Sequence, residues 1–396
     1  MSKLPYNRSV DYGHSMEKIH NHFKFLLRSS ILCTVFLSLA ACTSKLQHDS
    51  NIKENSNQTP LVRITKTDSK NEISVMEFNV ENLFDNEHDN GTEDYPFLPL
   101  KEKNKPEIQK FCSEIKSSFY RDECYSKDWN DDIVKFKLSQ VAKTIKYTEN
   151  GIGADIILME EVENIKILNR LTDTELKDLG YQTRVLIEGP DTRGIDPALI
   201  SKFPLSGKPK LHIIPYKDSD AEKLKIAYKS RGILEVPLLL PNGKELTVMV
   251  GHFPSQSNPT EWRGQAIQFL KDKMIQYEHE GRAVIAGGDF NIIDSEEKSY
   301  GYFSKELSQV AAISHLVGCE SCSGTHNHKG HWSFLDILAF GNNLEKAGLE
   351  LIPQSIEVVK APHHMKRNGA PLSFQDEKKE GVSDHFPLYS RLKIHY

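Results

Sequence analysis

Short apolar runs alternate with amphipathic stretches from about residue 72 to the end of the chain. Residues 73–79 alternate in polarity, as a half-buried strand does. An Asn-Gly pair at 242–243 lies between two apolar runs and predicts a hairpin turn. Further strands are predicted at 155–159, 181–187, 197–201, 232–240, 246–252, 283–287, 334–340 and 387–394.

Two helices stand out between these strands. Asn130 is a good capping residue for a helix in which Val134, Leu138, Val141 and Ile145 share one face. A second helix is predicted over residues 260–277. Many strands with hairpins and interleaved helices indicate two packed sheets covered by helices. No internal repeat or second domain boundary is visible within residues 72–396.

Residues 81–130 form the longest stretch without a clear pattern. A connection of this length is too long for a simple turn between two elements. We therefore expect it to be a functional loop or an insertion.

Composition is typical of a globular protein. The chain has 396 residues, of which 38% are hydrophobic and 27% charged, and its mean hydropathy is −0.49. These values exclude a polytopic membrane protein, a collagen-like fibre and a mostly disordered chain. The formal net charge of −5 argues against a protein that coats nucleic acid by charge alone, although an acidic enzyme can act on nucleic acid through bound cations.

The N-terminus predicts export. Lys24 and Arg28 precede the apolar residues 31–41, which end at Cys42, so residues 1–41 are interpreted as a signal peptide. The run is too short to favour a stable membrane span. Residues 39–42, LAAC, resemble a bacterial lipobox, in which the cysteine is acylated and becomes the mature N-terminus. A cleaved, secreted protein is the alternative, and Met16 is an alternative start.

Residues 42–71 are polar and poor in aromatic residues, as expected of a flexible tether. Together with the lipobox they predict a protein held on a bacterial envelope membrane by its lipid. Thr43 stands where an Asp typically retains lipoproteins at the inner membrane, so the outer membrane, at its periplasmic or surface face, is the expected location. No obligate protein partner is evident.

Four cysteines follow Cys42, in two local sets. An oxidising compartment favours disulfides between Cys112 and Cys124 and between Cys319 and Cys322. The second set is followed by His326, His328 and His331, which makes a zinc site the alternative. That alternative is weaker because the spacing is not that of a regular zinc finger.

Polar side chains follow several of the buried strands. Residues 156–162, IILMEEV, run from apolar residues into paired acids, and residues 284–291, VIAGGDFN, run into Asp289 and Asn291. Packing alone gives no reason to end buried strands in carboxylates. Carboxylate and amide oxygens are the ligands of hard divalent cations such as Mg²⁺. With Asp336 and the Ser-Asp-His run at 383–385 they form a candidate site.

These residues resemble the endonuclease/exonuclease/phosphatase superfamily, the fold group of deoxyribonuclease I, over residues 72–396. Seven segments match in order: residues 76–85, 155–164, 193–200, 250–255, 288–291, 332–336 and 383–385. The resemblance implies a four-layer α/β sandwich of two mixed β-sheets flanked by helices. It also implies a metal-dependent phosphoesterase site at one edge of the sheets.

The resemblance also implies roles for individual residues. Asn79 and Glu161 would hold Mg²⁺ or Mn²⁺, with Asp384 as a further metal or phosphate ligand. His385 would be the acid/base, Asp336 its carboxylate partner and His252 a second histidine. Asp289 and Asn291 would place the attacking water and the phosphate, and Arg193 and Asp196 would contact substrate. A Glu at 160 stands where a Gln often precedes the metal ligand, and we assign the ligand to Glu161.

The predicted function is therefore metal-dependent hydrolysis of phosphodiesters. Residues 80–85 and 252–255 look like segments of bacterial extracellular nucleases, which favours an endonuclease acting on DNA or RNA. A sphingomyelinase-like or other lipid or inositol phosphoesterase is the alternative, because the fold alone does not select a substrate. A non-catalytic binding protein on the same fold is disfavoured, since every expected catalytic residue type is present.

Overall fold

The computed structural model describes residues 71–396. The predicted signal peptide, the predicted lipidation site at Cys42 and residues 43–70 of the predicted tether lie outside the described residues. Within the described part of the chain, no helix combines the length and the apolar character needed to cross a bilayer.

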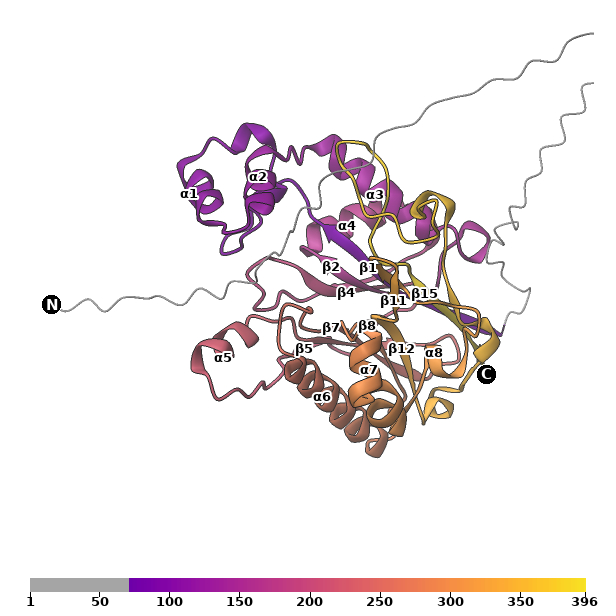
Figure 1. The fold of residues 1–396 in the computed structure, drawn as a ribbon. Coiled ribbons are helices and arrows are strands. Elements are labelled where there is room, and N and C mark those ends of the chain that lie inside the picture. Colours follow the sequence, from indigo (N-terminus) through magenta and orange to yellow (C-terminus); the bar gives the residue numbers. More distant parts are fainter. Residues whose placement is uncertain (1–70) are drawn as a thin grey trace, which may run out of the picture. The chain divides into compact units, whose positions relative to one another are not determined.

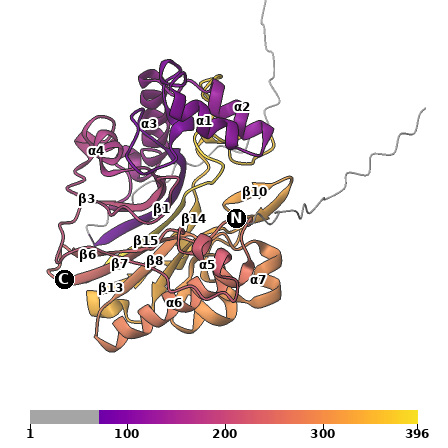
Figure 2. The same ribbon diagram turned by 90° about the vertical axis from the view of Figure 1, so that its left-hand side faces the viewer.

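Two mixed β-sheets face each other, with helices on their outer faces (Figures 1 and 2). The first sheet has the order β13-β15-β1-β2-β4-β3, and β14 also pairs with β15. Its strands are β1 (Glu72–Leu83), β2 (Ile156–Val162), β3 (Thr183–Leu186), β4 (Asp196–Ser201), β13 (Leu349–Leu351), β14 (Glu357–Val358) and β15 (Leu388–Ile394).

The second sheet has the order β5-β6-β7-β8-β12-β9. Its strands are β5 (Lys210–His212), β6 (Ile233–Leu239), β7 (Glu245–His252), β8 (Val284–Asp289), β9 (Ala311–Ile313) and β12 (Asp336–Gly341). A separate two-stranded hairpin consists of β10 (His326–His328) and β11 (His331–Ser333).

The helices are α1 (Pro106–Glu114), α2 (Ser118–Ser126), α3 (Asp131–Ile145), α4 (Ile165–Asp173), α5 (Ala221–Ala227), α6 (Thr260–His279), α7 (Asp294–Tyr300) and α8 (Ser314–Val317). Figure 1 shows α3 and α4 outside the first sheet, and α6 and α7 outside the second. The four-layer α/β sandwich predicted from the sequence is thereby confirmed.

Each sheet contains one parallel pair: β1 with β2, and β7 with β8. A parallel pair needs a crossover between its strands. Helix α3 lies within the first crossover and α6 within the second. Because parallel strands run in the same direction, the carboxyl ends of β1 and β2 meet at one edge, and those of β7 and β8 do the same.

The predicted α3 helix forms as its sequence pattern indicates. The Asn130 side chain accepts hydrogen bonds from the backbone N–H groups of Asp132 and Ile133, which caps the first turn. The apolar stripe that includes Val134 and Leu138 is buried against the outer face of the first sheet. The nine predicted strands and the α6 helix are likewise present.

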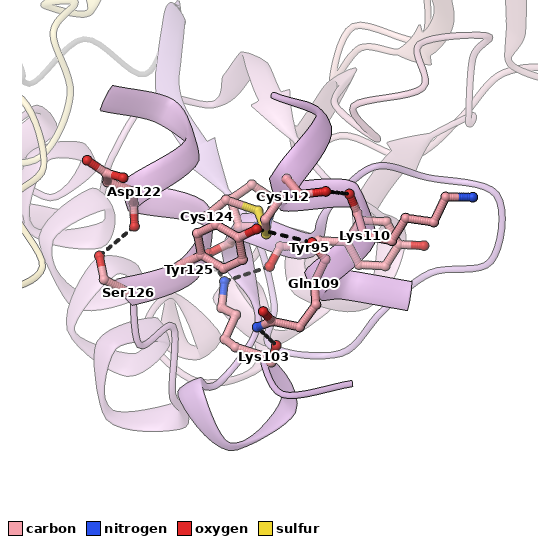
Figure 3. Close-up of a disulfide and its surroundings, with 11 residues drawn as sticks. Tyr95, Lys103, Gln109, Lys110, Cys112, Asp122, Cys124, Tyr125 and Ser126 are labelled. Atoms are coloured by element: carbon pink, nitrogen blue, oxygen red, sulfur yellow. Dashed lines mark hydrogen bonds between the residues drawn. A yellow bond between two sulfur atoms is a disulfide. The ribbon is translucent and has the colours of Figure 1, made fainter. Parts of the chain in front are cut away.

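Residues 81–130 differ from the prediction of a loop, because they include α1 and α2. A disulfide joins Cys112 of α1 to Cys124 of α2, whose Cα atoms are 5.6 Å apart (Figure 3). Around it, Leu98 and Ile108 complete a small apolar cluster separate from the main core. Each helix is nine residues long, and helices this short are marginally stable by themselves, so the disulfide adds a constraint to the small cluster that they bury.

The second cysteine pair is also joined. The Cα atoms of Cys319 and Cys322 are 5.3 Å apart, and their sulfur atoms form a disulfide. Oxidised cysteines do not ligate zinc, because the ligand is the thiolate. The zinc site that would combine these cysteines with the following histidines is therefore not what the structure contains.

Candidate active site

One edge of the layer between the two sheets is polar, and it is built by strand alternation. In β1, Ile73 and Val75 point into the apolar layer between the sheets, and Glu77 and Asn79 continue on the same face. The same change from apolar to polar side chains on the inward face occurs in β7 at His252 and in β8 at Asp289. In the antiparallel β12 it occurs at the first residue, Asp336. The strands therefore deliver polar side chains from both sheets to a common edge.

Glu161 does not follow this alternation, because the backbone of β2 is irregular at this residue. The pairing of β1 with β2 shifts between Asn79 and Leu83, and Glu161 itself has a φ of +63°. A non-glycine residue in this region is strained, and such strain is typical of functional sites. Glu160 stays fully buried, whereas Glu161 lines the cavity, and its Oε2 accepts a hydrogen bond from the backbone N–H of Asn82 at 2.9 Å.

His385 and Asp336 form a buried pair. Nδ1 of His385 lies 2.8 and 2.9 Å from the two carboxylate oxygens of Asp336, which is completely buried. This contact places the Nδ1 proton on the Asp336 side and leaves Nε2 free to face the cavity that His385 lines. Burial lowers the pKa of His385, but the carboxylates of Asp336, Asp384 and Asp289 outweigh it and raise the pKa well above its usual value.

The loop that carries His385 is held from three sides. The hydroxyl of Ser383 donates to the carbonyl of Asn79 at 2.7 Å and accepts from the backbone N–H of His385 at 3.1 Å. Nζ of Lys137, a completely buried lysine of α3, donates to the carbonyl of Val382 at 2.6 Å. His364 donates through Nε2 to the carbonyl of Ser383 at 2.8 Å. These hydrogen bonds fix the backbone segment that positions the imidazole of His385.

Asp289 is the centre of a second hydrogen-bonded group. Its Oδ2 accepts from the side-chain amides of Asn79 and Asn291, each at 3.1 Å, and its Oδ1 accepts from the backbone N–H of Asn291 at 2.8 Å. Burial is the main reason that the pKa of Asp289 rises to about 7. A carboxylate with this pKa accepts and releases a proton near neutral pH.

His252 is a neutral imidazole between an arginine and Asp289. Its Nε2 accepts from Nη2 of Arg231 at 2.7 Å and lies 3.5 Å from Oδ2 of Asp289. Burial and the positive charges of Arg231 and Arg193 hold the pKa of His252 well below its usual value. Arg231 is itself paired with Asp191 at 2.8 Å, so the position of His252 is fixed by a chain of three polar contacts.

Of the two residues predicted to contact substrate, Arg193 and Asp196, only the first lines the cavity. Arg193 lines the cavity, and its Nη2 donates to Oδ1 of Asn82 at 3.1 Å. Asp196 does not line it. This residue is 3% exposed and its Oδ1 accepts from the backbone N–H of Gly189 at 3.0 Å, so it orders the loop that carries Arg193. Because Asp196 is not among the cavity-lining residues, its direct contact with substrate stays a prediction.

The polar edge opens into a cavity of about 850 Å³. Of the predicted site residues, Glu161, Arg193, His252, Asp289, Asn291, Asp384 and His385 line it. Asn79 and Asp336 lie behind this lining, in contact with Asp289 and His385 respectively. Of the residues predicted to be catalytic, metal-binding or substrate-binding, the structure therefore brings together all except Asp196.

The oxygen donors at this edge suit a hard divalent cation. Glu161 and Asp384 present carboxylates to the cavity, and Asn79 supplies an amide at the end of β1. Two more carboxyls, Glu77 and Glu160, are fully buried behind them, and burial raises the pKa of each well above its usual value. The two carboxylates that face the cavity, Glu161 and Asp384, with the amide of Asn79, fit a site for Mg²⁺ or Mn²⁺.

Several site features were not predicted from the sequence. Arg231 precedes β6 in a run that carries no motif, and only its contact with His252 identifies it. Glu77 has the signal of a charged residue within a buried strand, and that signal was available in the alternation of β1. His326 of the small hairpin also lines the cavity, with its ring centroid 4.9 Å from that of His385.

Comparisons with known proteins agree with this architecture. A model of the endonuclease/exonuclease/phosphatase family matches residues 113–394. An endonuclease/exonuclease/phosphatase family protein from Bacteroides thetaiotaomicron is 15% identical in structural alignment, with a TM-score of 0.50 that covers 82% of this chain and 95% of that one.

Two further structures are similar with lower TM-scores. A mannosyl-6-phosphatase from Bacteroides thetaiotaomicron VPI-5482 is 15% identical, with a TM-score of 0.49 over 81% of this chain and 99% of that one. A humanised D. rerio TDP2 is 13% identical, with a TM-score of 0.47 over 81% and 99%. A search of curated proteins found no match. At 15% identity and a TM-score of 0.50, the first of these structures shows the fold alone.

Proposed function

This chain belongs to the endonuclease/exonuclease/phosphatase family, and we propose that it is a metal-dependent phosphodiesterase, an endonuclease that cleaves DNA or RNA. The observation that carries the proposal is the meeting, in one cavity, of the His385–Asp336 pair, the Asp289 group and the oxygen donors Glu161 and Asp384. These are the parts needed to activate water, transfer a proton and neutralise a phosphate.

In this mechanism Asp289 accepts the proton of the attacking water. Its hydrogen bonds from Asn79 and Asn291 fix its orientation, and its pKa of about 7 suits the task at neutral pH. The side-chain amide of Asn291 also donates to the carbonyl of Phe253 at 3.2 Å, which fixes the amide beside the reacting phosphate.

His385 donates a proton to the leaving oxygen. Its raised pKa keeps the imidazole protonated, and Asp336 holds Nδ1 so that the Nε2 proton faces the cavity. Asp336 acts through His385 as a positioning residue. Loss of this carboxylate would both lower the pKa of His385 and free its ring to rotate.

Asn79, Glu161 and Asp384 would hold Mg²⁺ or Mn²⁺, which supplies positive charge for the phosphate oxygens as negative charge develops on them. Arg193, at the cavity wall, would contact a phosphate of the substrate. His252 and Arg231 would shape the same wall from the second sheet.

Nucleic acid is the substrate that the chain's own features favour. The cavity wall carries Arg193 for a phosphate contact. The segments 80–85 and 252–255 that resemble extracellular nucleases both lie at the site edge. A bacterial envelope location, with anchoring by lipid at Cys42, is proposed on the sequence of residues 1–71 alone.

Cleavage assays with the full-length protein test the proposal. Plasmid DNA, single-stranded DNA, RNA and sphingomyelin would be incubated with excess Mg²⁺, with and without EDTA. We expect chelator-sensitive cleavage of nucleic acid that is lost in His385→Ala and kept in His279→Ala, since His279 is an exposed residue at the end of α6. Cleavage of sphingomyelin alone would show that the protein is a lipid phosphodiesterase and not a nuclease. Cleavage of no substrate, or cleavage indifferent to EDTA, would contradict the proposal.

A further inference from the structure

The β10–β11 hairpin presents a cluster of histidines to the cavity. Residues directly opposite in an antiparallel pair share a face, and so do residues two apart in one strand. His328 pairs with His331 and His326 pairs with Ser333, which places the three histidines on one face of the hairpin. All three line the cavity, so this is the face turned toward the active site.

The hairpin is fixed in this position by its turn and its base. Lys329 and Gly330 both have positive φ, +50° and +91°, as a two-residue type I′ turn requires. His326 forms an isolated antiparallel bridge with His385, and the backbone N–H of Phe386 donates to the carbonyl of Thr325 at 2.9 Å. The backbone thus holds His326 beside His385.

His326, Asp384 and His385 have the arrangement of a metal site. One ligand atom from each lies within 4.8 Å of the other two. The separation between Nε2 of His385 and Oδ1 of Asp384 is 3.9 Å, compared with about 3.3 Å between ligands of a tetrahedral zinc ion. The side chain of Asp384 is 44% exposed, so a small rotation can close the difference.

This set shares Asp384 with the proposed Mg²⁺ ligands but adds the two imidazoles of His326 and His385. Two imidazoles and one carboxylate suit zinc and related transition metals, whereas Mg²⁺ prefers oxygen. Because Nδ1 of His385 is engaged with Asp336, Nε2 is the atom available to a metal, and a carboxylate behind a ligating histidine is a common supporting contact.

We propose that His326, Asp384 and His385 form a second cation site, specific for Zn²⁺ and similar transition metals, whose occupation inhibits the enzyme. Zinc binding forms a bond to Nε2 of His385 and releases the proton of that nitrogen to solvent. No oxidation or reduction is involved. With Nε2 bound to metal, His385 has no proton to give to a leaving group, so hydrolysis stops until the zinc is removed.

Calorimetric titration of the full-length protein with ZnCl₂, in excess Mg²⁺, tests for the site directly. We expect one zinc ion per chain in the wild type. His326→Gln should weaken the affinity at least by the 10- to 100-fold that loss of a supporting residue typically costs, about 1.4–2.8 kcal/mol. His279→Gln, which changes an exposed histidine of α6, is the matched control and should bind zinc as the wild type does.

A second variant controls for the possibility that His326→Gln weakens zinc binding only by misfolding the β10–β11 hairpin. Asp384→Asn changes a half-exposed side chain and should also weaken zinc binding, with circular dichroism unchanged. Zinc affinity that is equal in the wild type, His326→Gln and Asp384→Asn would overturn the proposal, and so would complete displacement of zinc by Mg²⁺.

The inhibitory consequence rests on the proposed function and has its own measurement. Zn²⁺ should inhibit Mg²⁺-dependent cleavage, and His326→Gln should shift the inhibition curve to higher zinc by the same factor as its loss of affinity. Zinc binding without any measurable hydrolase activity would support the site and contradict the proposed enzyme. Zinc binding at the site without inhibition would overturn the inhibitory role.

Discussion

His385 and Asp336 link the two sheets of the sandwich through one side-chain contact. Asp336 is the first residue of β12 in the second sheet, and His385 lies three residues before β15 in the first. Nδ1 and Oδ2 are 2.8 Å apart, and both residues are buried. The geometry of the acid/base pair therefore depends on how the two sheets pack on each other.

Removal of the imidazole should abolish most of the activity without unfolding the protein. His385→Ala is expected to lower kcat by about 10²–10⁴-fold, the usual cost of losing a positioned acid/base. Asp336→Asn should lower kcat with little change in KM, because it disturbs the orientation and pKa of His385 and leaves the cavity wall intact. Steady-state kinetics, with circular dichroism as the folding check, make the measurement. A folded His385→Ala enzyme with near wild-type kcat would refute the assignment.

The adjacent acids Glu160 and Glu161 should respond differently to the same substitution. Glu161→Gln removes a carboxylate that faces the cavity, so more Mg²⁺ should be needed for half-maximal activity. Glu160→Gln removes a buried carboxyl whose raised pKa keeps it neutral, so the Mg²⁺ requirement should change little. Activity measured against Mg²⁺ concentration separates the two. The ligand assignment would be reversed if Glu160→Gln alone shifted the curve.

Glu163 should make the stability of the fold depend on pH. Burial raises its pKa to about 9, so between the ordinary carboxyl pKa and about pH 9 the folded protein holds a proton that the unfolded chain has lost. Its contribution to the free energy of unfolding therefore falls as pH rises through this window. The Glu163→Gln variant has no ionisable group at this position. Its free energy of unfolding, relative to that of the wild type, should therefore increase by at least about 1 kcal/mol between about pH 5 and pH 8.

Urea unfolding of the wild type and Glu163→Gln at about pH 5 and about pH 8 gives the difference in their free energies of unfolding. Glu296→Gln is a suitable comparison, because hydrogen bonds from Arg263 lower the pKa of that carboxyl despite its burial, and its substitution should destabilise. A pH-independent difference between Glu163→Gln and the wild type would show that Glu163 is not held protonated.

Lipid attachment at Cys42 should retain the protein on the outer membrane. Cys42→Ala removes the thiol that is acylated, so the variant should lose incorporation of labelled fatty acid and leave the membrane fraction. Fractionation and metabolic labelling of wild type and variant provide the measurement. A variant that still carries the label and still sediments with membranes would rule out the lipoprotein assignment.

The four cysteines Cys112, Cys124, Cys319 and Cys322 should contain no free thiol in the exported protein. A background with Cys33→Ser and Cys42→Ala removes the other two cysteines of the chain from the count. Thiol titration after denaturation under non-reducing conditions should then give none from these four. Four free thiols would exclude both disulfides, and two would exclude one of them, which single Cys→Ser variants would identify.

Local sequence patterns determined the framework of the protein. Polarity alternation located the nine main strands, and helical spacing with a capping Asn located α3, because both patterns arise within a single element. Polar residues at the ends of buried strands marked the acid pair Glu160–Glu161 and Asp289 with Asn291 for the same reason, whereas Asn79 was assigned from the family resemblance. The order of the matching segments then fixed the family and the four-layer fold.

Tertiary structure decided the contacts between residues distant in the chain. Asp196 turned inward to order a loop, Arg231 reached His252 across 21 residues, and the strained backbone at Glu161 separated it from Glu160. His326 reached the active site only because the hairpin pairs with the His385 segment. A local pattern reports whether a side chain is buried, but its partner depends on which strands meet at the shared edge, and that is set by the packing of two sheets whose strands come from the whole domain.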